Sequence, residues 1–153
     1  MSGNMRARLR GIPNVLLRFR TVQIGSPRKP GEGLRIGAVR SLPRGVPKSE
    51  YRKRDLFDIW LPILAPSRTL LTAFRDGNVS PAKFFQRYRN EMTQTDPRQV
   101  IQLLATLARQ TPLSVACYCD DESRCHRSVL GSLIREAACN YLRQPDAESS
   151  DQE

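Results

Sequence analysis

The side chains best suited to chemistry lie within residues 113–130, which hold three of the four cysteines and the only histidine of the chain. Cys117 and Cys119 end an apolar run, and Cys125 and His126 follow after a short acidic stretch. A thiolate is a nucleophile and a metal ligand, and histidine titrates near neutral pH. We therefore predict the functional site here, with Cys119, Cys125 and His126 as candidate catalytic residues.

Two elements must position these side chains. Residues 113–118 are short and apolar, follow Pro112 and precede Asp120, a pattern that predicts a buried strand. From about Ser123 onward, apolar residues recur at spacings of three and four, which predicts an amphipathic helix. The candidate site thus lies on a strand-loop-helix corner. In open α/β sheets ligands bind outside the carboxyl ends of the strands.

The cysteines allow several interpretations. Near a helix N-terminus, Cys125 would be favoured as a thiolate, but cysteines also pack well as small apolar residues. Zinc is a third interpretation, with Cys117, Cys119 and Cys125 as its ligands. Adjacent residues point about 100° apart on a helix, so Cys125 and His126 are not expected to share one ion, and no resident cofactor is predicted. A reversible Cys119–Cys125 disulfide stays open, and Cys139 is assigned to the core.

His126 precedes two apolar helix residues by three and four positions, so we expect it to lean toward the sheet. There it could act as a general acid or base, or it could hydrogen-bond the backbone at the end of the sheet. Arg127 is a candidate anion ligand beside it.

A second group of basic residues flanks a predicted turn at residues 43–45. Arg40, Arg44 and Lys48 would lie near one another there, and arginine binds phosphate with two parallel bonds. Together with Arg127, these residues are the predicted ligands of a small anion. Pairing with nearby acidic residues is the structural alternative.

The charge distribution extends this argument to larger partners. The net charge is +10, and residues 1–54 carry fourteen Lys or Arg against two acids. Such a segment favours anionic partners, nucleic acid included, although arginine-rich composition alone can produce it. No stretch approaches the roughly 20 apolar residues of a membrane span, so we expect a cytoplasmic protein with no membrane partner.

The order of elements predicts the fold class. Strands are expected over residues 14–23 and 34–39, and three helices with start signals at Ser67, Ser80 and Asp96 precede the corner. This alternation predicts a single compact α/β domain with a small, mostly parallel sheet flanked by about four helices. The domain should span residues 14–143, between a flexible basic extension (residues 1–13) and a disordered acidic tail (residues 144–153).

Several short motifs in this order resemble the YeaO-like family of bacterial proteins, a DUF488-type domain of unknown function. They are Arg40 with Pro43-Arg44-Gly45 and Lys48, Asp58-Ile59-Trp60, Leu64-Ala65-Pro66-Ser67, Phe85 with Tyr88 and Glu91, and the closing Cys125-His126-Arg127. The resemblance covers about residues 22–140. It implies a compact bacterial α/β domain.

Three functional hypotheses follow. The first is that the corner, opposite Arg40, Arg44 and Lys48, binds a small phosphorylated or nucleotide-like ligand, with or without catalysis. The second is a non-enzymatic nucleic-acid-associated module that uses the basic segment. The third is thiol redox chemistry or zinc binding at the same corner.

Overall fold

The computed structural model describes residues 17–141, so the basic extension and the acidic tail expected from the sequence lie outside the described residues. Within residues 17–141 the regular elements are β1 (Phe19–Gln23), β2 (Leu34–Gly37), β3 (Ile59–Trp60), α1 (Arg68–Arg75), α2 (Pro81–Met92), α3 (Thr95–Leu107), β4 (Leu113–Cys117) and α4 (His126–Tyr141).

The described strands form one parallel sheet in the order β1-β4-β2-β3. β4 is central, because its Leu113 pairs with Phe19 of β1 and with Leu34 of β2. All five residues of β4 are buried, which explains why its sequence is a nearly continuous apolar run. The predicted α/β domain with a small parallel sheet is confirmed.

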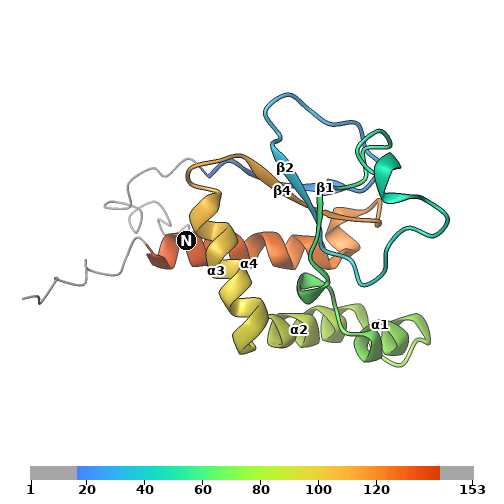
Figure 1. Ribbon diagram of the computed structural model, residues 1–153. Helices are drawn as coiled ribbons and strands as arrows, with labels where there is room; N and C mark the ends of the chain where they lie inside the picture. The colour runs from blue at the N-terminus through green and yellow to red at the C-terminus, as the bar shows by residue number, and fades with distance from the viewer. Residues whose placement is uncertain (1–16, 142–153) are drawn as a thin grey trace, which may run out of the picture.

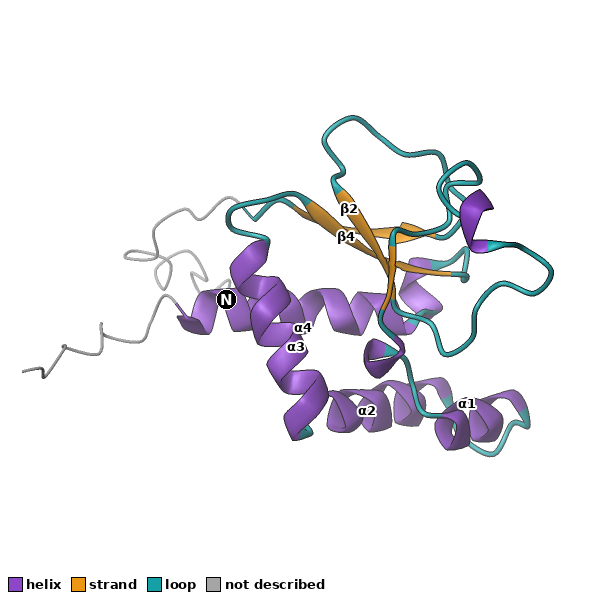
Figure 2. Cartoon of the chain, viewed as in Figure 1, coloured by secondary structure: helices purple, strands orange, loops and turns teal. Residues whose placement is uncertain are grey.

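The two faces of the sheet are covered differently. Figures 1 and 2 show the helices packed on one face, with α4 running beneath the strands, and long loops over the other face. The helical side holds the main core, in which Ile36 and Val115 of the sheet cluster with Leu130 and Ile134 of α4. Because strand side chains alternate, neighbouring residues such as Ser114 face the loops instead.

The predicted helix signals are largely confirmed. Ser67 accepts a hydrogen bond from the N–H of Leu70 at 3.1 Å, and Ser80 accepts one from the N–H of Lys83 at 3.3 Å. α3 differs, since it begins at Thr95 rather than after an Asp96 cap. Pro97 lies within its first turn, where backbone N–H groups have no partner inside the helix and proline is tolerated.

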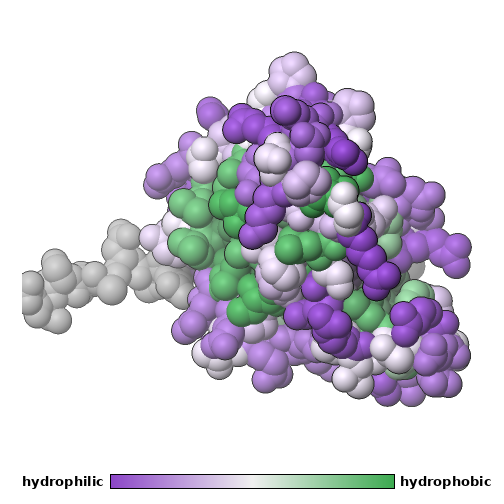
Figure 3. Space-filling model, turned by 45° about the vertical axis from the view of Figure 1, so that its right-hand side comes forward, coloured by the Kyte–Doolittle hydropathy of each residue, from purple (hydrophilic) through white to green (hydrophobic). Residues whose placement is uncertain are grey.

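The apolar spacing along α3 suggests an inner face that includes Leu103 and Leu107, but these residues are 58% and 39% exposed, because Ile101, Leu104 and Ala105 form the buried face. Cys139 was assigned to the core but is exposed, and its neighbour Ala138 is buried in its place. Figure 3 shows hydrophobic residues reaching the surface between hydrophilic ones on one side of the molecule. In the part of the chain described, no helix has the length and apolar character to cross a membrane.

A buried ion pair fastens the loops to their face of the sheet. Arg35 is fully buried, and its Nε and Nη2 donate to the carboxylate of Glu32 at 2.6 and 3.0 Å. Its Nη1 donates to the carbonyls of Ser26 and Asp55, and the hydroxyl of Ser114 donates to Glu32. The sequence analysis did not single out this network.

Candidate functional site

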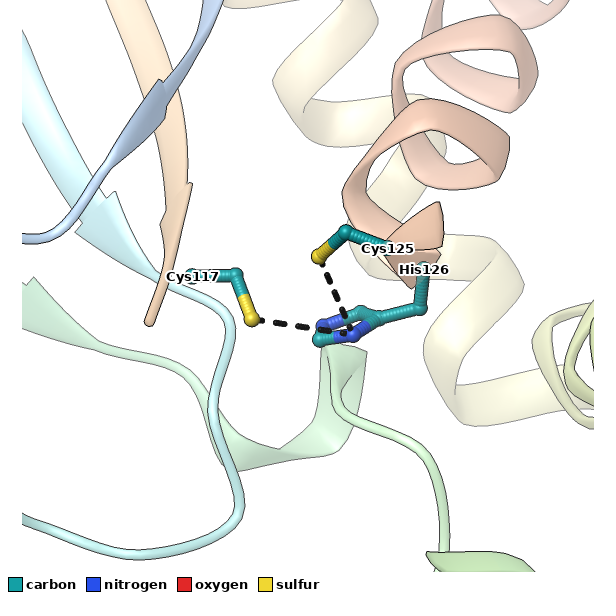
Figure 4. Close-up of side chains that lie close together, drawn as sticks. All are labelled: Cys117, Cys125 and His126. Carbon is teal, nitrogen blue, oxygen red and sulfur yellow. Dashed lines mark hydrogen bonds between the residues drawn. The ribbon is translucent and has the colours of Figure 1, made fainter. Parts of the chain in front are cut away.

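The corner predicted from the sequence brings its chemically active side chains together. Cys117 is the last residue of β4, and His126 is the first residue of α4. Cys125 lies between that helix and a short 3₁₀ helix, Glu122–Arg124. Figure 4 shows both sulfurs directed at one nitrogen of the imidazole, that of Cys117 from the end of the strand and that of Cys125 from the start of the helix.

The His126 ring is buried and its orientation is fixed. Its Nε2 lies 2.7 Å from the carbonyl oxygen of Ala38, and the ring of Tyr88 packs edge-on with centroids 5.2 Å apart. A carbonyl only accepts hydrogen bonds, so Nε2 carries the proton and donates it. In the neutral ring Nδ1 then has the free lone pair. His126 thus leans toward the sheet as expected, and of the two alternatives left open for it, the hydrogen bond to the backbone is the one that the structure contains.

That lone pair faces two thiols. Nδ1 of His126 is 3.8 Å from the Sγ of Cys117 and 3.8 Å from the Sγ of Cys125. The three ligand atoms lie within 4.8 Å of one another, and all three residues are buried. The Sγ of Cys117 is also 3.9 Å from that of Cys119, which is exposed at the mouth of the cluster. We call these four residues the corner cluster.

The convergence of Cys125 and His126 contradicts the argument from helix geometry. The helix was expected from about Ser123, but it begins at His126, and Cys125 has extended backbone angles of φ −114° and ψ 143°. The 100° rotation between adjacent helical residues therefore does not apply to this pair. Cys125 turns its sulfur back toward the sheet.

The thiols of the corner cluster have unequal proton affinities. The hydrogen bond that Cys117 donates to Cys119, together with burial, raises the pKa of Cys117 to about 11. Hydrogen bonds to Cys117 and Cys119 and burial raise the pKa of Cys125 as well. Cys119 accepts from both thiols, so its pKa is lowered, and Arg127 acts in the same direction. These directions favour the negative charge on Cys119 rather than on Cys125, the thiol that a position near the helix N-terminus would favour.

Arg127 was predicted to bind an anion, but its guanidinium is directed at backbone carbonyls. The side chain is 4% exposed. Its Nη1 donates to the carbonyls of Cys119 at 2.6 Å and Val22 at 3.3 Å. These bonds hold the loop after β4 against the end of β1. In this arrangement Arg127 positions the loop that carries Cys119.

The other predicted anion ligands do not act as one group. Arg40 donates to the carbonyls of Pro66 at 3.1 Å and Ala65 at 2.9 Å, and so holds the segment before α1. Arg44 and Lys48 are exposed. Lys48 lines a hollow that also contains Arg52, which the sequence analysis did not select. The spacing of four residues between Lys48 and Arg52 was the available signal.

The chain belongs to a DUF488-type family: the family model DUF488-N3a, described as the active DUF488-N3 subclade, matches residues 19–138. This range contains every element of the sheet and all of the corner cluster. The resemblance noted in the sequence is therefore confirmed. Comparison with curated proteins gave no match, and neither did comparison with solved structures.

Proposed function

We propose that the protein binds a zinc ion through Cys117, Cys119, Cys125 and His126. The supporting observation is the convergence of Cys117, Cys125 and His126, whose ligand atoms lie within 4.8 Å of one another. Cys119, whose Sγ is 3.9 Å from that of Cys117, is the nearest further thiol and the proposed fourth ligand. A tetrahedral zinc site with the usual bond lengths to sulfur and nitrogen has edges of about 3.5–3.8 Å. Cys117, Cys125 and His126 already lie near that geometry, and Cys119 would have to turn its side chain toward them to complete it.

The surroundings of the ligand atoms also support this proposal. A metal-binding histidine usually donates its second ring N–H to a carbonyl or carboxylate, and His126 donates to Ala38 in this way. The backbone N–H groups of Cys119 and Arg127 act to lower the pKa of Cys117 and of Cys125, against the larger effects that raise both. Such N–H groups stabilise thiolates, which are the form that binds metal.

The kind of metal follows from the donor atoms. Three thiolates and an imidazole suit zinc, whereas magnesium and calcium prefer oxygen ligands. With four protein ligands the site is closed and structural, and it ties the end of β4 and the following loop to the start of α4. Cys119, which is exposed, would be the ligand that exchanges most easily.

Thiol chemistry without a metal is the second candidate. It is favoured by Cys119, which is exposed and has a lowered pKa, and by the description of the family as an active subclade. In this account the thiolate of Cys119 is the nucleophile, and the thiols of Cys117 and Cys125 are its hydrogen-bond donors. All cysteines of the described residues are free thiols.

Zinc content and competition with a chelator test the proposal. We expect one zinc ion per chain in protein purified without chelator, and at least a tenfold loss of affinity in Cys117→Ser and Cys125→Ser. Cys139→Ser is the matched control, because it makes the same change at an exposed cysteine outside the cluster.

Labelling with iodoacetamide separates the two candidates. Zinc should protect Cys119, and a chelator should expose it. A wild-type protein that stays metal-free with zinc present, and whose Cys119 reacts equally fast with and without chelator, would exclude zinc and leave the thiol account.

A further inference from the structure

A second candidate site lies beside the edge strand β3, away from the four residues of the corner cluster. It is a hollow of about 400 Å³, a volume within the range of small-molecule pockets. Lys48, Tyr51 and Arg52 line it from the segment after β2, and Phe57 and Trp60 line it from the segment that forms β3.

The charges in this hollow favour an anion. Lys48 and Arg52 are exposed, and neither belongs to a salt bridge found within residues 17–141. The acid in the lining, Asp58, is already bound: Arg28 donates to both of its oxygens at 2.9 and 3.0 Å, and the N–H of Arg35 donates at 2.9 Å. Lys48 and Arg52 therefore have no direct acidic partner, although Arg52 lies near enough to Asp58 to help lower its pKa.

The aromatic residues of the hollow favour a ring. Trp60 is 38% exposed, yet its Nε1 donates to the carbonyl of Val39 at 2.7 Å, so the indole is held in place. Tyr51 and Phe57 are buried beneath, with ring centroids 5.1 Å apart in an edge-on arrangement. A fixed and partly exposed indole can stack on a nucleobase, a contact worth about 1–3 kcal/mol per base.

We propose that the hollow binds a nucleoside monophosphate, with its base on Trp60 and its phosphate between Lys48 and Arg52. The proposed anion site therefore differs from the one expected from the sequence, which included Arg40 and the corner cluster. Of the residues predicted to bind the anion, only Lys48 lines this hollow. It does not depend on zinc, since the residues that line it are distinct from the proposed metal ligands.

The single tryptophan of the chain makes the proposal easy to test, because intrinsic tryptophan fluorescence reports on Trp60 alone. Titration with the four common ribonucleoside monophosphates should change this fluorescence saturably for at least one of them. Because nucleotides absorb the exciting light, calorimetry on the same samples should give the same affinity independently. The corresponding nucleoside and inorganic phosphate should each bind at least tenfold more weakly, because each has only half of the contacts.

Variants give the decisive comparison. Lys48→Ala and Arg52→Ala should each weaken binding about tenfold, whereas Lys53→Ala, a neighbouring exposed lysine that pairs with Glu50, should leave it unchanged. Equal losses in all three variants would show general charge attraction and overturn the proposal. So would the absence of saturable binding for all four nucleotides in folded wild-type protein.

Discussion

Two groups of buried polar side chains in this protein differ in how fully their hydrogen-bonding atoms find partners. In the ion-pair network under the loops, the guanidinium of Arg35 finds two carboxylate oxygens and two carbonyls, and Ser114 adds a bond to Glu32. In the corner cluster the Nδ1 of His126 has only two sulfurs at 3.8 Å.

This difference is the reason for assigning a structural role to the ion-pair network and for proposing a binding role for the corner cluster. Buried polar groups normally find strong partners, and an unsatisfied one costs about 1–3 kcal/mol. The ion-pair network meets that requirement with its own atoms, so it needs no ligand. The corner cluster has only weak thiol donors, and a metal ion would satisfy all of its ligand atoms at once. Both groups are buried, so burial alone does not reveal which of them is a site.

The largest effect should come from breaking the ion-pair network. Arg35→Met leaves the carboxylate of Glu32 buried without its cation, and such a change costs about 3–5 kcal/mol. Urea denaturation of the variant and the wild type measures the loss. The double variant Glu32→Gln/Arg35→Met should recover much of it. A loss below about 1 kcal/mol for the single variant would show that the network is dispensable.

The corner cluster should respond to a chelator instead. At a free zinc concentration a thousandfold above the Kd, bound zinc stabilises the fold by about 4 kcal/mol, and a chelator removes this contribution. Thermal unfolding with and without chelator should therefore differ for the wild type and for Arg35→Met, and the difference should be clearly smaller for Cys117→Ser. A shift of equal size in Cys117→Ser would place the metal elsewhere.

A smaller effect concerns acid stability. Burial by itself raises the pKa of Glu32, but the bonds from Arg35, the N–H of Lys29 and Ser114 together hold this pKa below its ordinary value. Glu32 therefore contributes stability that is full above the ordinary pKa of about 4.3 and is lost as the pH falls through the folded-state value. Glu32→Gln should flatten this acidic decline in the free energy of unfolding. An unchanged pH profile would contradict the assigned role.

The smallest effects should occur at the surface. The ion pair between Arg89 and Glu136 is 2.8 Å long, but both side chains are about half exposed. Glu136→Ala should change the free energy of unfolding by less than about 1 kcal/mol, and Cys139→Ser by about 0.5 kcal/mol or less. Urea denaturation checks both. A larger loss in either variant would mean that the surface stabilises this fold more than its exposure suggests.

Sequence patterns predicted the helices and strands better than they predicted the contacts between side chains. Ser67 and Ser80 marked helix starts because capping is a local interaction, and β4 was recognisable because a central parallel strand is apolar throughout. The corner was found because its cysteines and histidine are close in sequence. Its geometry was not, because the extended backbone of Cys125 delays the start of α4 to His126, three residues after the start at about Ser123 that the pattern suggested.

Long-range partners were beyond local patterns. Nothing near Arg127 in the sequence indicates that its guanidinium bonds the carbonyl of Val22, 105 residues away. The same holds for the bond between His126 and Ala38, which fixes the tautomer. Trp60 and Arg52 line the second hollow because of the path of the loop between them, which local sequence patterns do not indicate.

The central claim is that the corner cluster is a metal site. Its most direct test is the absorption spectrum of the protein reconstituted with cobalt(II), because cobalt(II) can replace zinc and its absorption depends on its ligands. One equivalent should give thiolate-to-cobalt charge-transfer absorption together with the intense visible bands of tetrahedral coordination. Zinc should abolish both, and Cys125→Ser should weaken the charge transfer while Cys139→Ser leaves it intact. A weak octahedral spectrum without charge transfer, in protein whose cysteines are shown to be reduced, would contradict the account.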